Sequence, residues 1–154
     1  MALPPKFATL YEAGDAWLAD CSARPTLVRA AWDVEKLAPI ESGRSWLVAE
    51  GRVTTGYQVL PRIRAGQRGP ALADPLLDKL WWLIPTDAAE DLDDVGQLVV
   101  HPPGWSLYCP PTGWQVEGRM WLTRPDGSGL LTNPTLLAAA FGPGGYRRPA
   151  EASS

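Results

Sequence analysis

Apolar residues are spaced for a helix near the start of the chain and fall into short continuous runs further along. Residues 5–22 carry apolar side chains at intervals of three and four, with Pro5 suited to a first helical turn. This spacing predicts an N-terminal helix that ends before Arg24-Pro25, because the residue before a proline disfavours helical conformation. The next run, residues 26–37, predicts a β-strand that ends at Ala38-Pro39.

The pattern between residues 41 and 66 is mixed and predicts two short helices. Residues 46–48 fit the first helix. Residues 57–63 fit the second, which tolerates Pro61 near its first turn and not in its middle.

The second half of the chain predicts mostly strands. Short apolar runs bounded by Gly, Pro, Asn or Asp cover residues 71–73, 80–84, 97–100, 105–109 and 114–123. The last two runs flank Pro-Pro-Thr-Gly, which predicts a β-hairpin or a strand pair joined by a loop. A final helix is predicted over residues 134–141, with Thr132 or Asn133 as its cap.

This order of elements predicts an α+β fold. We expect a single domain over residues 1–141, with a mostly antiparallel or mixed sheet of about five or six strands between an N-terminal and a C-terminal helix. A length of 154 residues fits one domain. Residues 142–154 are rich in Gly, Pro, Arg and Ser and predict a disordered tail.

Composition indicates the cellular compartment in which we expect the protein. The apolar share of 45% and the charged share of 20% are typical of a soluble globular domain. No apolar run approaches the roughly 18 residues needed to cross a bilayer, and the N-terminus lacks the layout of a secretion signal, so we expect a cytoplasmic protein with no membrane partner. Cys21 and Cys109 are then expected to be reduced and buried.

Asp33 and Glu35 are the sharpest candidates for chemistry. On the predicted strand, alternation would place both carboxylates on one face, where they could hold Mg²⁺ together with phosphates. The alternative is an ordinary solvent face, opposite a buried face that carries Trp32 and Val34. That alternative is commoner among paired carboxylates.

The only concentration of basic residues includes Arg62, Arg64 and Arg68. These side chains could contact phosphate or an acidic protein surface, and the alternative is an ordinary solvated helix face. The net charge of −3 gives no general attraction to nucleic acid, although it permits a local basic patch. Eight tryptophans are many for this length, so we expect most in the core and some, with Trp105 and Trp114 as candidates, at a contact surface.

Other polar groups carry weaker signals. The acidic run over residues 87–94 lacks the spacing of a calcium loop and predicts a solvated segment. His101 is the only histidine, and no partner at a fixed spacing marks it as a general base.

Several segments together resemble a known group of proteins. They are Trp32-Asp33-Val34, residues 55–60 leading to Gly69-Pro70-Ala71-Leu72-Ala73-Asp74, the run Leu80–Pro85, residues 107–113, Trp121–Pro125, and Leu131-Thr132-Asn133-Pro134. Their order is similar to that in small actinobacterial proteins related to the N-terminal domain of bifunctional DNA primase-polymerases. The resemblance covers roughly residues 27–141.

The resemblance implies a particular set of site residues. Active members of that superfamily hold divalent metal with an acidic pair on a strand, contact nucleotide phosphates through a strand histidine and use a further acid. Asp33 and Glu35 match the acidic pair. The expected histidine position falls in residues 80–84, which contain none, and His101 does not lie in a matching context. With no third acid in place, the resemblance implies a degenerate, inactive relative.

Three functions follow as expectations. The first is a non-catalytic primase-polymerase-like domain that binds nucleic acid or a protein partner and needs no cofactor. The second is a metal-dependent nucleotidyltransferase, a DNA primase or polymerase, that uses Asp33 and Glu35 with Mg²⁺. The third is a regulatory protein-interaction module without a nucleic-acid role, whose tryptophan-rich surface supports docking or a homo-oligomer.

Overall fold

The computed structural model of the protein describes residues 5–142 and confirms a single α+β domain. The helices are α1 (Pro5–Asp20), α2 (Pro25–Asp33), α3 (Val53–Val59) and α4 (Pro134–Ala140). The strands are β1 (Ala38–Glu41), β2 (Leu47–Gly51), β3 (Ala71–Asp74), β4 (Lys79–Ile84), β5 (Val99–Val100), β6 (Ser106–Cys109) and β7 (Met120–Thr123). Short 3₁₀ turns cover Leu60–Arg62, Ala65–Gln67 and Ala89–Leu92.

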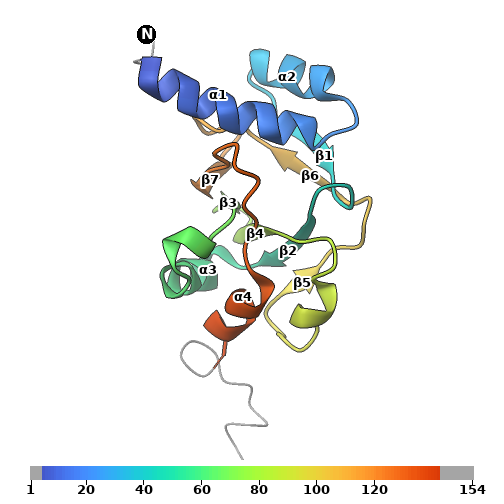
Figure 1. Cartoon of the computed structure of the whole chain (residues 1–154), viewed down its shortest axis with the longest axis vertical. Helices are drawn as coiled ribbons and strands as arrows, with labels where there is room; N and C mark the ends of the chain where they lie inside the picture. Colours follow the sequence, from blue (N-terminus) through green and yellow to red (C-terminus); the bar gives the residue numbers. More distant parts are fainter. Residues whose placement is uncertain (1–4, 143–154) are drawn as a thin grey trace, which may run out of the picture.

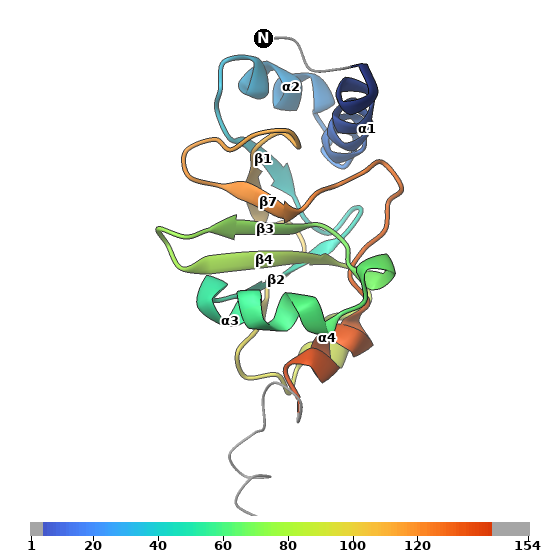
Figure 2. The same cartoon turned by 90° about the vertical axis from the view of Figure 1, so that its left-hand side faces the viewer.

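The strands form two antiparallel sheets. The larger has five strands in the order β5-β2-β4-β3-β7, and β1 pairs with β6 in a two-stranded ribbon, called the β1–β6 ribbon below. Helices α1 and α2 lie at one end of the molecule and α3 and α4 toward the other, with the strands between them (Figure 1). Figure 2 shows β7, β3 and β4 running side by side, with α3 beside β4 and β2.

The five-stranded sheet separates two apolar cores because neighbouring residues of a strand point to opposite faces. On β4, Leu80, Trp82 and Ile84 join the core formed with α3 and α4. Trp81 and Leu83 of the same strand join the core formed with α1, α2 and the β1–β6 ribbon. The uninterrupted apolar run of β4 therefore reflects burial on both faces.

The sequence prediction was wrong for residues 26–48. Residues 26–33 belong to helix α2, whose buried side chains Val28 and Trp32 are four residues apart. Pro25 stands in its first turn, where the missing N–H costs no hydrogen bond. Strand β1 begins at Ala38, where the prediction ended a strand, and Trp46–Val48 leads into β2 and forms no helix.

The predicted pairing of the runs around Pro-Pro-Thr-Gly was also wrong. Strand β6 pairs with β1, with Tyr108 opposite Pro39, whereas β7 pairs with β3. The two runs lie in different sheets because each finds a strand partner much earlier in the chain. Only residues 120–123 of the predicted strand 114–123, and residues 99–100 of 97–100, are extended in sheets.

Other predictions are confirmed. Strands β3 and β4 lie where the apolar runs placed them, and α1 covers most of the predicted helix 5–22. The helix predicted over residues 57–63 is confirmed only in part, because α3 begins earlier, at Val53, and ends at Val59, where the 3₁₀ turn Leu60–Arg62 follows. The Asn133 side chain caps α4 by accepting a hydrogen bond from the backbone N–H of Leu136 at 3.1 Å. Apart from Gly142, the predicted tail lies outside the described residues. No helix within residues 5–142 is long and apolar enough to cross a membrane.

Candidate functional site

The structure removes the geometric premise for a metal site at Asp33 and Glu35. Asp33 is the last residue of α2, and Glu35 lies beyond it in a left-handed conformation with φ of 56°, so strand alternation does not align them. Both side chains are exposed. Across the described chain, no group of three or more His, Cys, Asp or Glu side chains could hold a metal ion. The nucleotidyltransferase alternative stays a prediction.

Two of the three candidate arginines already serve the fold. Arg62 donates from Nη1 to the backbone carbonyl of Ala140 at the end of α4, at 3.1 Å. Arg68 donates from Nε to the carbonyl of Ile63 at 2.6 Å. Arg64 is exposed. Hydrogen bonds within the chain therefore hold two of the three guanidinium groups.

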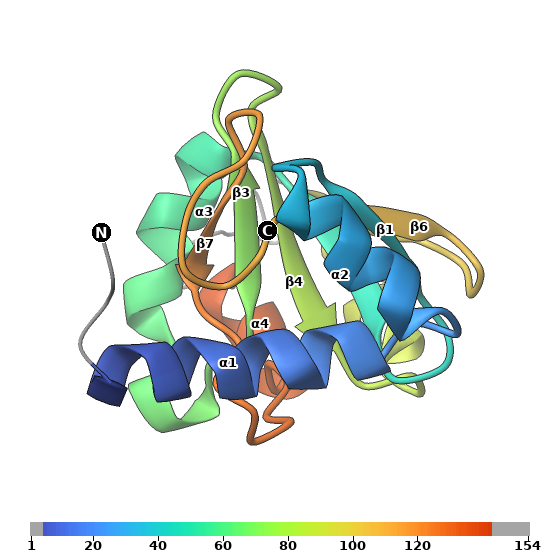
Figure 3. The ribbon, with the colours of Figure 1, turned by 90° about the horizontal axis from the view of Figure 1, so that it is seen from above.

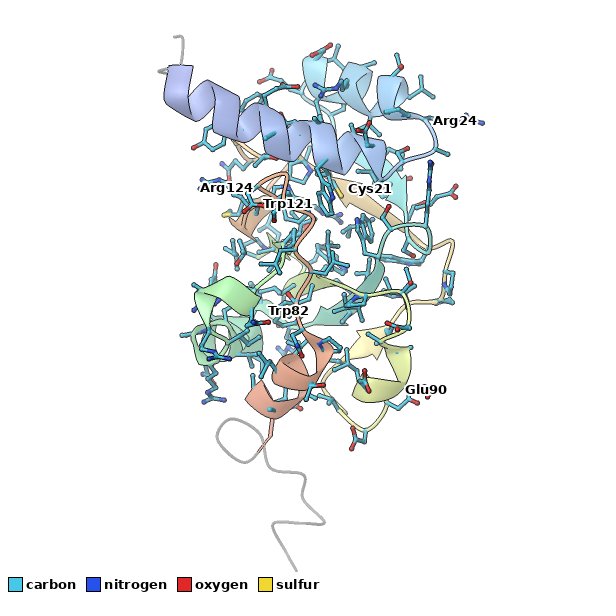
Figure 4. All side chains as sticks on the ribbon, in the orientation of Figure 1. Cys21, Arg24, Trp82, Glu90, Trp121 and Arg124 are labelled. Atoms are coloured by element: carbon cyan, nitrogen blue, oxygen red, sulfur yellow. The ribbon has the colours of Figure 1, made fainter. Side chains whose placement is uncertain are left out.

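The tryptophans divide much as their number suggested. Five are buried: Trp32, Trp46, Trp81, Trp82 and Trp121. Figure 4 shows Trp82 in the middle of the molecule, among the side chains between the sheet and α4. Trp114 is 49% exposed, whereas Trp105 stacks on the His101 imidazole with ring centroids 3.7 Å apart. Of the two predicted contact residues, Trp114 is thus open and Trp105 is partly covered.

A network of charges at one end of the sheet centres on Glu50, which the sequence analysis did not select. Glu50 lies on β2 on the same face as Val48, toward the β1–β6 ribbon. Its Oε2 accepts a hydrogen bond from Nζ of Lys79 at 2.7 Å, and its Oε1 accepts one from Nε1 of Trp81 at 2.9 Å. Nε2 of His101 lies 2.9 Å from the same Oε1. We call Glu50, Lys79, Trp81 and His101 the Glu50 network. Within it, His101 has a carboxylate partner that its position in the sequence did not reveal.

These contacts change the acidity of Glu50. Burial by itself raises the pKa of this carboxyl, but the hydrogen bonds from Lys79, His101 and Trp81, with the charge of Lys79, outweigh burial. The pKa of Glu50 is therefore lowered, and the carboxylate is ionised at neutral pH. A His–Glu pair is one component of general-base catalysis. Here Glu50 also serves Lys79 and Trp81, and the imidazole face stacks on Trp105.

A second ion pair extends the network toward the ribbon. Nε of Arg119 donates to Oδ2 of buried Asp74 at 3.0 Å, and Nη1 donates to the backbone carbonyl of Tyr108 on β6 at 2.8 Å. The guanidinium carbon also lies 4.5 Å from the centroid of a Trp81 ring. Arg119 thus connects Asp74 on β3 to Tyr108 on β6 and binds the five-stranded sheet to the β1–β6 ribbon, which is a structural role.

A groove lies elsewhere, between α2 and the outer face of the β1–β6 ribbon. We call it the α2 groove; its volume is about 560 Å³, within the range of ligand sites. The helix side is lined by Ser22, Ala23, Arg24, Leu27 and Val28, and the ribbon side by Pro39, Glu41, Ser106 and Tyr108. Figure 3 shows α2 beside β1 and β6, and Figure 4 shows Arg24 projecting outward where α1 leads into α2.

The α2 groove leaves both apolar and charged side chains open to solvent. Leu27 is 58% exposed and Tyr108 is 50% exposed, so two large apolar side chains face water there. Within residues that the structure describes, neither Arg24 nor Glu41 forms an ion pair. Exposed apolar side chains beside unpaired charges are typical of surfaces that bind a partner.

A smaller groove of about 350 Å³ lies beside the Glu50 network. Its charges are already paired, because Arg52 donates to Asp78 and Lys79 donates to Glu50, both at 2.7 Å. A charged ligand would have to replace these contacts, which makes this groove the weaker candidate for a binding site.

Neither cysteine is a candidate nucleophile. Cys21 and Cys109 are free and buried, as the sequence predicted, and burial raises the pKa of both thiols. Both thiols therefore stay protonated at neutral pH, which lowers their nucleophilicity.

Comparison of the chain with protein-family models, with curated proteins and with solved structures gave no match. The class that the fold defines is an α+β domain with a five-stranded antiparallel sheet and a separate two-stranded ribbon. The resemblance to primase-polymerase domains stays a prediction.

Sequence reasoning missed the groove for an identifiable reason. Arg24 and Glu41 were expected at opposite ends of a strand predicted over residues 26–37. In the structure, helix α2 replaces most of that strand, and the chain then turns back along it into β1, so both residues line one groove. Glu50 had a usable signal, because it is a lone carboxylate after the apolar run Leu47–Ala49. The helix predicted at residues 46–48 hid that signal.

Proposed function

We propose that this protein is a binding domain whose partner is another protein, held in the α2 groove. The observation that carries the proposal is the exposure of Leu27 and Tyr108 on facing walls of a groove with two unpaired charges. A few central residues supply most of the binding energy of a protein–protein interface. Burial of Leu27 and Tyr108 against a partner could therefore supply much of the affinity. Its function is then recognition rather than catalysis.

The charges favour a protein over a nucleic acid. The α2 groove offers one cation and one anion, Arg24 and Glu41, whereas affinity for nucleic acid depends on several cations that neutralise phosphates. Arg62 and Arg68, two of the three candidates for phosphate contacts outside the groove, donate to backbone carbonyls of the chain itself. A net charge of −3 adds no attraction to a polyanion.

A displayed library of short random peptides, selected on the immobilised full chain, tests the proposal. Leu27→Asp should lower the affinity of the selected peptides by about tenfold or more, because it places a charge where an apolar contact forms. Leu27 is the third residue of α2, where an acidic side chain favours the helix, so the variant should fold. Circular dichroism checks this.

Leu76→Asp is the matched control. Leu76 is 89% exposed in the turn between β3 and β4, outside the α2 groove, and its replacement should leave affinity unchanged. Selected peptides that bind Leu27→Asp as tightly as the parent protein would refute the proposed site. A library in which nothing is enriched would refute it as well.

A further inference from the structure

The ribbon side of the α2 groove is arranged in two rows. Pro39 lies opposite Tyr108 in the register of the β1–β6 ribbon, and Glu41 lies opposite Ser106. Strand residues two apart point to the same face about 7 Å from one another. The groove therefore has an apolar row and, one repeat further along, a polar row that carries a carboxylate.

The helix side changes from apolar to polar in the same direction. Helix α2 leads through residues 34–37 into β1 and packs against it, so the two elements run in opposite directions. Ser22 accepts a hydrogen bond from the backbone N–H of Arg24 at 2.9 Å and lines the same groove as Glu41, the last residue of β1. Nη1 of Arg44, three residues after Glu41, donates to the Ser22 carbonyl at 3.3 Å. Arg24 thus stands toward the Glu41 row, and Leu27, further along α2, stands toward the Pro39 row.

We infer that the α2 groove binds an extended segment of the partner protein with an apolar side chain and, two residues away, a basic side chain. The apolar side chain lies between Leu27 and Tyr108, and the basic one pairs with Glu41. An acidic residue next to the basic one pairs with Arg24. The inference rests on the proposed function and names the chemistry that the partner presents.

An extended segment fits this arrangement better than a helix. Neighbouring side chains of an extended chain point to opposite sides, so consecutive basic and acidic residues reach the ribbon wall and the α2 wall respectively. Successive side chains of a helix diverge by much less, since a turn takes 3.6 residues. The two-residue spacing of Pro39 and Glu41 also equals the same-face repeat of an extended chain.

Exchange of the two groove charges tests the inference. The double variant Arg24→Glu with Glu41→Lys keeps the net charge and alters two exposed positions, so it should fold. The probes are two synthetic peptide pools, one with the order apolar–any–Lys–Glu and one with apolar–any–Glu–Lys. We expect the parent protein to prefer the first pool by about tenfold and the double variant to prefer the second, as measured by fluorescence polarisation.

The outcomes separate the inference from the proposed function. If both proteins bind the two pools equally while Leu27→Asp still lowers affinity by about tenfold or more, the inferred charge pattern is wrong and the proposed binding groove is supported. If Leu27→Asp binds like the parent protein, the groove itself is wrong. A dimer in light scattering that dissociates in Leu27→Asp would make a second copy of the chain the occupant and would overturn the inference.

Discussion

The Glu50 network and the α2 groove contain the same kinds of side chain in opposite situations. Around Glu50, the charged groups and the Trp81 N–H have partners inside the chain, at distances between 2.7 and 2.9 Å. In the α2 groove, Arg24 and Glu41 have no ion pair in the described structure, and Leu27 and Tyr108 face water.

This difference separates stability from recognition. A polar group taken out of water destabilises the fold unless it is hydrogen-bonded, so the partly buried Glu50 network stabilises the fold only while its hydrogen bonds are complete. Exposed charges keep their hydration and cost little, so they remain available to a partner. Variants of the first region should therefore change folding, and variants of the second should change binding.

Glu50→Ala should show the largest effect on stability. It removes the acceptor shared by Lys79, Trp81 and His101, and we expect the free energy of unfolding to fall by about 2–3 kcal/mol. Urea denaturation measures the change. Glu41→Ala in the α2 groove is the control and should stay within about 0.5 kcal/mol. Equal losses in the two variants would abolish the distinction between the regions.

Acid should weaken the Glu50 network in a defined direction. Because the folded pKa of Glu50 lies below its ordinary value of 4.5, its contribution is fully present above that value and is lost as the pH falls through the folded pKa. Burial raises the pKa of Asp15, which has the opposite effect on stability. We therefore compare the free energy of unfolding of Glu50→Gln with that of the parent protein from neutral pH to pH 3. The difference between the two proteins isolates the contribution of Glu50 to the pH dependence of stability.

If Glu50 contributes as described, the gap between the parent protein and Glu50→Gln narrows as the pH falls below about 4.5. A gap that is constant over the whole range would mean that the charge of Glu50 does not stabilise the fold.

Glu35→Gly should have a smaller effect of the opposite sign. Glu35 has φ of 56°, which is unfavourable for a side chain with a Cβ, and glycine should raise the free energy of unfolding by about 0.5–1 kcal/mol. Thermal denaturation with and without Mg²⁺ measures it, with Asp33→Asn as the control. Stabilisation of the parent protein by Mg²⁺ that both variants lose would instead restore the predicted metal site.

Local patterns were sufficient for several elements and insufficient for others. Strands β3 and β4 were predictable because continuous apolar runs bounded by turn residues have few alternatives, and α4 because Asn133-Pro134 is a strong start signal. The helix over residues 26–33 was not predictable in this way, because Val28 and Trp32 fit a short helix as well as a strand. Their helix is fixed by distant contacts, such as the hydrogen bond from Trp32 Nε1 to the carbonyl of Cys109.

The sequence by itself determined the α+β class, the capped C-terminal helix and the burial of most tryptophans, since each follows from neighbouring residues and general burial preferences. The tertiary structure alone decided that β6 pairs with β1, that His101 meets Glu50, and that Arg24 and Glu41 line one groove. The physical reason is separation along the chain. Those contacts join residues 17 to 71 positions apart, and no local pattern specifies which distant segment a strand or a charge will find.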